Sequence, residues 1–130
     1  MDIQGIGPAY AEKMKAAGIN KVSQLLAQGK TPKGRKELEE KTGIRHDLIL
    51  TWVNHADLFR IPGVGPQFAE LLEAGGVDTV KEFAHRKAEN LYTKLVEVND
   101  KEHRTKRVPT VKELQKMIEQ AKELDPEVTY

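Results

Sequence analysis

The sequence predicts an all-α protein in which two tandem repeats, each of about four short helices, pack as one compact domain. Three observations support this fold. Apolar residues recur at the spacing of helices, no segment alternates as a strand does, and many features of the first half return in the second. Because repeated units usually stack to bury their apolar faces, we expect one shared core. The repeats would cover residues 1–60 and 61–125, with a C-terminal tail at 126–130.

The clearest repeated feature is a Gly-x-Gly turn followed by proline and a short helix. Residues 3–19 read IQGIGPAYAEKMKAAGI, and residues 61–77 read IPGVGPQFAELLEAGGV. The likeness continues beyond the turns, since residues 20–25 match residues 78–83. An apolar stripe near the end of each half also matches: Ile49, Trp52, Val53, Ala56 and Phe59 against Leu114, Met117, Ile118, Ala121 and Leu124. Two copies of so specific a pattern indicate a true internal repeat.

The first half predicts four helices. Pro8 occupies the first position of a helix that runs to about residue 17, where Gly18 ends it. We expect Asn20 to cap a second short helix and Thr31 to cap a third, which ends near residue 43. A fourth helix should cover residues 46–59, with the single tryptophan on its buried stripe.

The second half predicts the same order of elements with an insertion. The helix after the second turn should end at residues 75–76, and Asp78 or Thr79 should cap a short helix. A further helix is expected over residues 89–98, followed by a loop over 99–108. The last helix should begin at Pro109 and Thr110 and run to Leu124, and the tail from residue 127 should be frayed.

Composition limits the classes of function. The 130 residues include 21 basic and 20 acidic side chains, a net charge of +1, so any nucleic-acid surface must be a local patch. The absence of cysteine excludes disulfides and cysteine zinc sites. No apolar run is long enough to span a membrane, and no signal-peptide pattern opens the sequence. We therefore expect a cytoplasmic protein without a membrane partner.

The two turns are the main candidates for binding chemistry. A glycine turn that leads into a helix leaves several N–H groups without intrahelical partners, at the positive end of the helix dipole. Such a place binds anions, and it contacts a phosphate backbone without reading bases. The side chains between the glycines should point inward. The expected donors are Gly5, Ile6, Gly7 and Ala9 in the first copy, and Gly63, Val64, Gly65 and Gln67 in the second.

The pattern resembles the helix-hairpin-helix motif of DNA-binding proteins that act without sequence specificity, such as repair polymerases, glycosylases, ligases and Holliday-junction-binding proteins. The resemblance implies a SAM-like helical domain whose hairpin N–H groups donate to a DNA phosphate, in some members through a bound monovalent cation. It implies no other cofactor. It also implies a basic residue on the helix after the hairpin, and Lys13 holds that position in the first copy.

Nearly the whole chain is also similar to an uncharacterised family, a domain of unknown function built from two such repeats. The similarity includes residues 10–13, residues 52–58 and the stretch from Pro109 onward. It implies the fold and no activity. The second copy has a preceding helix but carries Glu70 and Glu73 after its turn, whereas only two residues precede the first copy. If one copy alone binds phosphate, we expect the first.

Two groups of basic residues could flank a phosphate track. The first is Lys33, Arg35 and Lys36 together with Lys30, and the second is Arg104, Lys106 and Arg107 together with Lys101. Taken alone, each group is better explained as solvated charge, and a position beside a turn would change that view. The four histidines have no metal-site spacing and are expected at helix caps or on the surface, so no metal site is expected.

The leading hypothesis is a non-enzymatic protein that binds nucleic acid, most simply the DNA backbone, through the N–H groups of the hairpins. No nucleophile or phosphate-loop motif supports catalysis. One alternative is a protein–protein adaptor that uses the hairpins only as packing elements, which the near-neutral charge and Glu70 and Glu73 favour. A second alternative is an RNA-binding or ribosome-associated role, because the same phosphate chemistry applies to RNA.

Overall fold

The chain forms two compact units in a computed structural model. The structure describes residues 6–103, 105–125 and 127–129. Unit 1 spans Met1–Asp57 together with Glu127–Tyr130, and unit 2 spans Leu58–Pro126. The described residues are helical or irregular and include no strand, which confirms the all-α class. The single core expected for both repeats stays a prediction.

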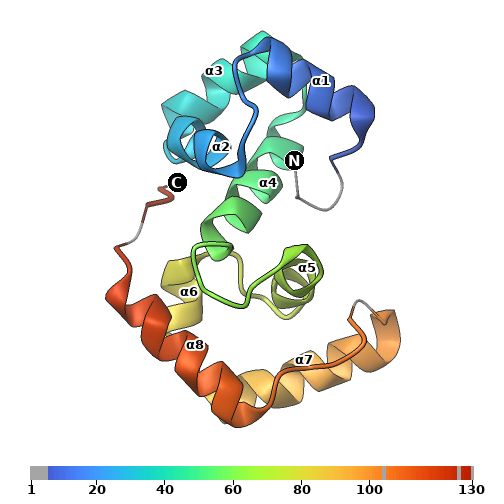
Figure 1. Ribbon diagram of the computed structural model, residues 1–130, viewed down its shortest axis with the longest axis vertical. Coiled ribbons are helices and arrows are strands. Elements are labelled where there is room, and N and C mark those ends of the chain that lie inside the picture. The colour runs from blue at the N-terminus through green and yellow to red at the C-terminus, as the bar shows by residue number, and fades with distance from the viewer. Residues whose placement is uncertain (1–5, 104, 126, 130) are drawn as a thin grey trace. The chain divides into compact units, whose positions relative to one another are not determined.

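Unit 1 contains α1 (Pro8–Ala16), α2 (Val22–Gly29), α3 (Pro32–Thr42) and α4 (His46–Leu58), whose last residue falls in unit 2. Helix α3 packs against both α1 and α2 (Figure 1). Trp52 is 2% exposed, which confirms its predicted place in the core. Other buried apolar side chains of this unit are Met14, Leu25, Leu38, Ile44, Ile49 and Val53.

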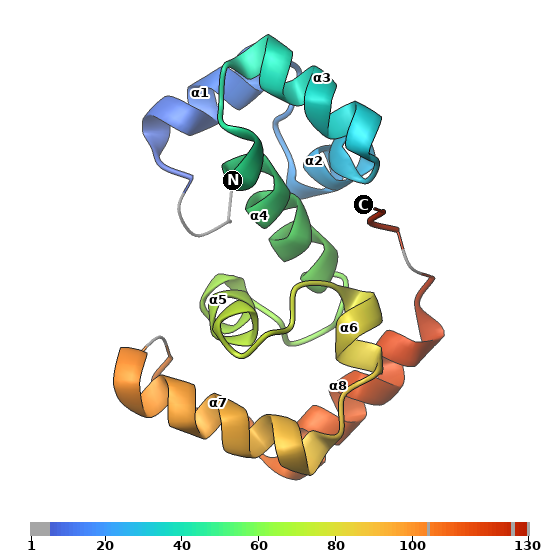
Figure 2. The same cartoon turned by 180° about the vertical axis from the view of Figure 1, so that it is seen from behind.

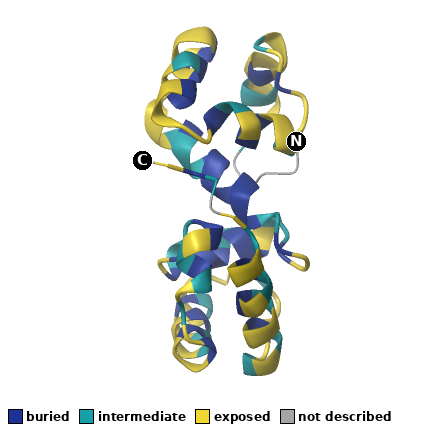
Figure 3. Cartoon of the chain, turned by 90° about the vertical axis from the view of Figure 1, so that its left-hand side faces the viewer, coloured by how far each residue is buried: buried dark blue, intermediate teal, exposed yellow. Residues whose placement is uncertain are grey.

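Unit 2 contains α5 (Pro66–Ala74), α6 (Val80–Ala84), α7 (Ala88–Glu102) and α8 (Val111–Glu123). Helix α8 packs against α6 and α7, and α7 also packs against α5 (Figure 2). The helices have a buried and an exposed side, as amphipathic sequences predict (Figure 3). The core of this unit includes Phe68, Leu71, Leu72, Phe83, Leu91, Leu95, Leu114 and Ile118.

The predicted threonine caps are present. The hydroxyl oxygen of Thr31 accepts from the backbone N–H of Gly34 at 3.1 Å, and Thr79 caps α6 in the same way. Thr110 was predicted to begin the last helix together with Pro109, but it is the residue that caps α8, which begins at Val111. The prediction for Asn20 was wrong. Helix α2 begins after Lys21, and the side-chain oxygen of Gln24 accepts from the N–H groups of Asn20 and Lys21. A glutamine inside the first turn therefore does the capping.

Helices α1 and α5 end with the same backbone geometry. In α1, Gly18 has a φ of +88°, and the next N–H donates to the carbonyl of Met14 at 2.8 Å. In α5, Gly76 has a φ of +91°, and the next N–H donates to the carbonyl of Leu72 at 2.8 Å. Both are Schellman motifs, which need a left-handed residue that glycine supplies without steric cost.

The loop predicted over residues 99–108 is partly wrong, because α7 continues to Glu102. No glycine or proline interrupts these residues, so nothing in the sequence stops the helix earlier. His103 ends it in a left-handed conformation with a φ of +50°. The side chain of Asn99 then holds the chain beyond the helix, since its amide donates to the carbonyl of Thr105 and its oxygen accepts from the Thr105 N–H, both at 3.0 Å.

The segment 127–129 was predicted to be frayed, and this was wrong. Val128 is only 9% exposed, and the N–H of Thr129 donates to the carbonyl of Lys30 at 2.8 Å. This segment belongs to unit 1 although it follows the helices of unit 2 in the sequence. No helix within the described residues is both long and apolar enough to cross a membrane.

Candidate functional site

The second Gly-x-Gly turn is fixed by hydrogen bonds between its own backbone groups. The N–H of Ile61 donates to the carbonyl of Leu58, and the N–H of Val64 donates to the carbonyl of Ile61, both at 3.1 Å. Gly63 has a φ of +92°, which other residues rarely adopt. A Cβ atom there would also lie 3.1 Å from the terminal methyl of Met117. The geometry of the turn therefore requires glycine at this position.

This hydrogen bonding changes the expected set of donors. Val64 was predicted to offer its N–H to a ligand, which is wrong because Ile61 already accepts that N–H. Its side chain is buried at 8% exposure, as expected. The N–H groups of Gly63, Gly65 and Gln67 donate to no acceptor among the described residues. Those of Gly65 and Gln67 lie at the start of α5, where the helix dipole favours an anion.

Neither the backbone conformation nor the packing requires glycine at Gly65 or at its counterpart Gly7. Both are N-cap residues with extended backbone, at φ values of −102° and −80°, which any residue can adopt. Among the described residues, no atom lies within 4 Å of a Cβ built at either position. Gly34 differs, since a Cβ there would lie 1.9 Å from the carbonyl oxygen of Gln28. Gly7 and Gly65 therefore leave open space next to a helix N-terminus.

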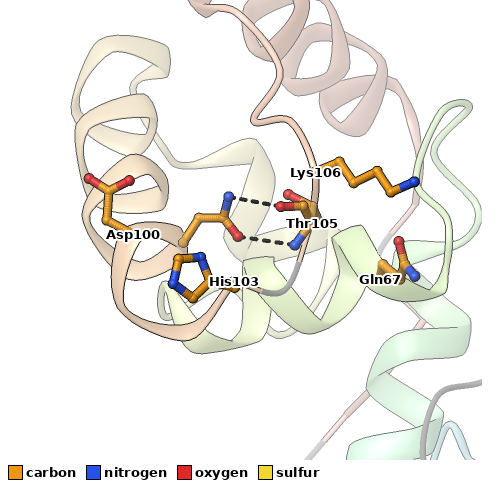
Figure 4. A pocket seen from close by; sticks show the side chains of 6 residues that line it. Gln67, Asp100, His103, Thr105 and Lys106 are labelled. Carbon is orange, nitrogen blue, oxygen red and sulfur yellow. Dashed lines mark hydrogen bonds between the residues drawn. The ribbon is translucent and has the colours of Figure 1, made fainter.

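In unit 2, the loop between α7 and α8 and the start of α5 line the same hollow of about 520 Å³. It is lined by Gln67, Asn99, Asp100, His103, Thr105 and Lys106. Lys106 and Gln67 lie on one side of the hollow, and Asp100 lies on the other (Figure 4). Lys106 forms no ion pair with any residue that the structure describes. An anion between Lys106 and the α5 N-terminus would thus meet a cation and backbone donors.

The other basic residues of this loop have different surroundings. Arg107 pairs with Glu113, and Arg104 lies outside the described residues. The backbone N–H of Thr110, followed by the guanidinium of Arg107, holds the pKa of Glu113 below its usual value. Arg107 is therefore tied to the start of α8, and Lys106 is the described loop cation that lines the hollow.

The first turn has its cation on its own helix. Gly7 and Ala9 are exposed, Ile6 is half-buried, and Gly5 lies outside the described residues. The ammonium of Lys13 lies 5.9 Å from the ring centre of Tyr10. That ring in turn meets Trp52 edge-on, with the centroids 5.2 Å apart. The aromatic pair thus gives the Lys13 ammonium a defined place over the Tyr10 ring.

The basic residues of α3 differ in their exposure to solvent. Lys33 and Lys36 are exposed, but Arg35 is 2% exposed. The Arg35 guanidinium donates to the carbonyls of Gly29 at 2.8 Å and Thr129 at 2.5 Å. The expectation that Arg35 lies on a phosphate track was therefore wrong, because unit 1 uses its donors internally. Sequence alone gave no signal for this, since one acceptor comes from the far end of the chain.

The environment of one histidine, His55, differs from the expected one. His55 was expected at a cap or on the surface, but it is 2% exposed within α4. His103 lines the hollow of unit 2, a role that sequence reasoning missed along with those of Asn99 and Thr105. The described residues contain no group of histidine, aspartate and glutamate side chains able to hold a metal ion.

Fold and turns together define an all-α protein with a duplicated glycine turn at the start of a helix. The chain belongs to the family described as domain of unknown function (DUF4332), whose model matches residues 4–124. This agrees with the similarity of nearly the whole chain to an uncharacterised family. Comparison with curated proteins and with solved structures finds no match.

Proposed function

We propose that this protein binds the phosphate backbone of nucleic acid, most simply of duplex DNA, without catalysis and without reading sequence. The second Gly-x-Gly turn would act as a helix-hairpin-helix element. The N–H groups of Gly65 and Gln67 would donate to one phosphate, and Lys106 would neutralise its charge. Backbone donors cannot distinguish bases, which accounts for binding without sequence preference.

The observation that carries this proposal is the open space at Gly65. Serine or aspartate at this N-cap would satisfy an N–H of α5 and stabilise the helix better than glycine does. Neither φ nor packing calls for glycine here, and Gly7 repeats the situation in the first copy. A glycine without an internal role, beside donors without acceptors, is suited to the close approach of another molecule.

The open space at Gly7 and Gly65 also favours nucleic-acid binding over the adaptor alternative. If the turns served only as packing elements in an adaptor, their glycines should lie against neighbouring atoms. Gly63 does so, but Gly7 and Gly65 do not. The position of Lys106 beside Gln67 also moves our preference from the first turn to the second, because it supplies the cation that α5 lacks. RNA offers the same phosphates as DNA, so the choice between them belongs to the experiment.

A salt titration tests the proposal directly. Fluorescence anisotropy would follow the binding of labelled duplex, single-stranded and branched DNA and of a structured RNA hairpin, each between about 20 and 200 mM salt. We expect the logarithm of the affinity to fall linearly with the logarithm of the salt concentration, since each neutralised phosphate releases counterions. Undetectable binding of all four probes at the lowest salt would overturn the proposal. Tightest binding of the RNA probe would reassign the partner from DNA to RNA.

A further inference from the structure

A second hollow of unit 2, the α6–α8 pocket, has a volume of about 350 Å³ and shares no residue with the hollow beside the second turn. Three apolar and three basic residues line it: Ala84, Ala121 and Leu124, and Lys81, His85 and Lys122. Ala84 and Leu124 are half-buried, so the apolar part of the pocket is open to solvent. Pockets of about 300 to 1,000 Å³ are of the size that takes a small ligand.

The pocket lies where α6 is shorter than its counterpart in the first half. Residues 78–83 match residues 20–25, so α6 corresponds to α2, but α6 has five residues and α2 has eight. In unit 1 the last turn of α2 lies against α4, since a Cβ at Gly29 would be 2.4 Å from a methyl of Val53. Because α6 already ends at Ala84, this last turn has no helical counterpart beside α8.

The end of α2 in unit 1 is also in contact with a short non-helical segment. The N–H of Thr129 donates at 2.8 Å to the carbonyl of Lys30, the residue that follows α2, and the neighbouring Val128 is buried. No segment of the described chain fills the α6–α8 pocket at the end of α6. The repeat therefore indicates a short peptide with one apolar side chain as the occupant that this place would take.

The charges around the pocket indicate which peptides would fit. Lys81 and Lys122 are exposed and form no ion pair with any residue that the structure describes. The Nδ1–H of His85 donates to the carbonyl of Lys81 at 2.7 Å, so Nε2 is the ring nitrogen available to a ligand. No acidic side chain of the described residues lines the pocket. Both lysines lie in the last turn of a helix, where a cation is favourable, but that role does not account for the apolar lining between them.

We propose that the α6–α8 pocket binds a short peptide segment of a partner protein, in which an apolar side chain stands next to acidic residues. The apolar side chain would contact Ala84, Ala121 and Leu124. The carboxylates would pair with Lys81 and Lys122, and they would select among apolar peptides by charge. Since this pocket and the hollow at Gln67 have no residue in common, the interaction does not depend on the proposed binding of nucleic acid.

The test is a nuclear magnetic resonance titration of the ¹⁵N-labelled full chain with three peptides of one design. The first is Gly-Glu-Leu-Glu-Gly, and the others carry glutamine or lysine in place of both glutamates. We expect the first peptide to shift the amide signals of residues 81–85 and 121–124, and the lysine peptide to bind at least about fivefold more weakly because it opposes like charges. Shifts that are absent, or that lie outside these residues, would overturn the proposal. Equal binding of the three peptides would also overturn it.

A matched pair of lysine variants separates the pocket from general charge. Lys122→Glu should weaken binding of the first peptide at least about threefold, whereas Lys116→Glu, an exposed lysine of α8 outside the pocket, should change it less. The spectrum of each variant shows directly whether it is folded. Equal weakening by the two variants would overturn the proposal. Duplex DNA or octanoate that shifts the same signals at lower concentration than the peptide would assign the pocket to nucleic acid or to a small amphiphile instead.

Discussion

The two Gly-x-Gly turns have the same backbone design but obtain their positive charge in different ways. Each places proline at the start of a helix after an extended glycine with open space around it, and each helix ends in a Schellman motif. The candidate cation for the first turn is Lys13, which lies on the same helix. The second has Glu70 and Glu73 on its helix and meets Lys106 from a loop far along the sequence.

In the proposed anion sites, the backbone donors and the positive charge therefore have different origins. The backbone part depends on glycines and a proline within a few residues, so it is copied together with the motif. The electrostatic part of the second turn depends on α7 packing against α5 and on the contact that Asn99 makes with Thr105. We therefore expect the second turn to be the more sensitive of the two to changes outside the motif.

The largest effect is expected from aspartate at the open glycine. Gly65→Asp should lower the affinity for duplex DNA by at least about tenfold, because it places a like charge where the phosphate would lie. The same change should cap α5 and leave stability equal or higher. Anisotropy at low salt and urea unfolding would measure the two quantities.

Gly7→Asp is the matched control for this prediction, since it introduces the same group at the equivalent place in the first turn. Its effect on affinity should be smaller than that of Gly65→Asp. A larger effect at Gly7 would reverse the comparison and make the first turn, with Lys13, the principal site. Equal effects would mean that both turns contact the phosphate backbone.

A smaller effect is expected from removal of the remote cation. Lys106→Ala should weaken binding equally across DNA sequences and reduce the slope of affinity against salt by about one, as loss of a single phosphate contact does. The same anisotropy series over salt measures both. Lys36→Ala removes an exposed lysine of unit 1 and serves as the charge control. If both variants change the slope alike, the binding depends on general charge instead of the hollow.

A third prediction concerns a glycine at one of the positions where the ends of α1 and α5 differ. Gly75 stands where the first copy has Ala17, and a Cβ at Gly75 would lie 2.9 Å from a terminal methyl of Leu95. Gly75→Ala reduces the freedom of the unfolded chain but moves Leu95, so the free energy of unfolding should change by less than about 1 kcal/mol. Urea unfolding measures this change. A loss of several kcal/mol would mean that α5 and α7 cannot adjust to the alanine of the first copy.

The smallest effect concerns the ion pair between Arg107 and Glu113 at the start of α8. The pKa of Glu113 is lowered in the folded state, so its contribution to stability is present above the unfolded value of 4.5 and is lost as pH falls through the lowered pKa. Between about pH 5 and pH 3, the unchanged chain should lose slightly more thermal stability than Glu113→Gln. Identical losses in thermal scans would contradict this.

Sequence predicted those parts of the fold that depend on local chemistry. Thr31 and Thr79 cap helices, and Gly18 ends one, because the groups that interact lie within a few residues of each other. The periodicity of apolar residues also placed α4 and α8 to within about two residues. Helix α7 ran past its predicted end because the charged residues after Asn99 suit a helix as well as a loop.

The candidate site was predictable only in its backbone part. The pairing of the Val64 N–H with Ile61 depends on how the turn closes, which the motif does not specify. The place of Lys106 beside Gln67 depends on tertiary packing, so the sequence could identify the lysine but not its neighbour. The internal role of Arg35 could not be predicted, because one of the carbonyls to which its guanidinium donates, that of Thr129, lies 94 residues away in the sequence.

The core position of Trp52 has a practical consequence for spectroscopy. It is the only tryptophan of the chain, and it lies buried in unit 1 in contact with Tyr10. Its fluorescence therefore reports on the unfolding of unit 1, whereas far-ultraviolet circular dichroism reports on the helices of both units. Coincident denaturation curves from the two signals would show a single cooperative transition. Separate curves would give each unit its own midpoint.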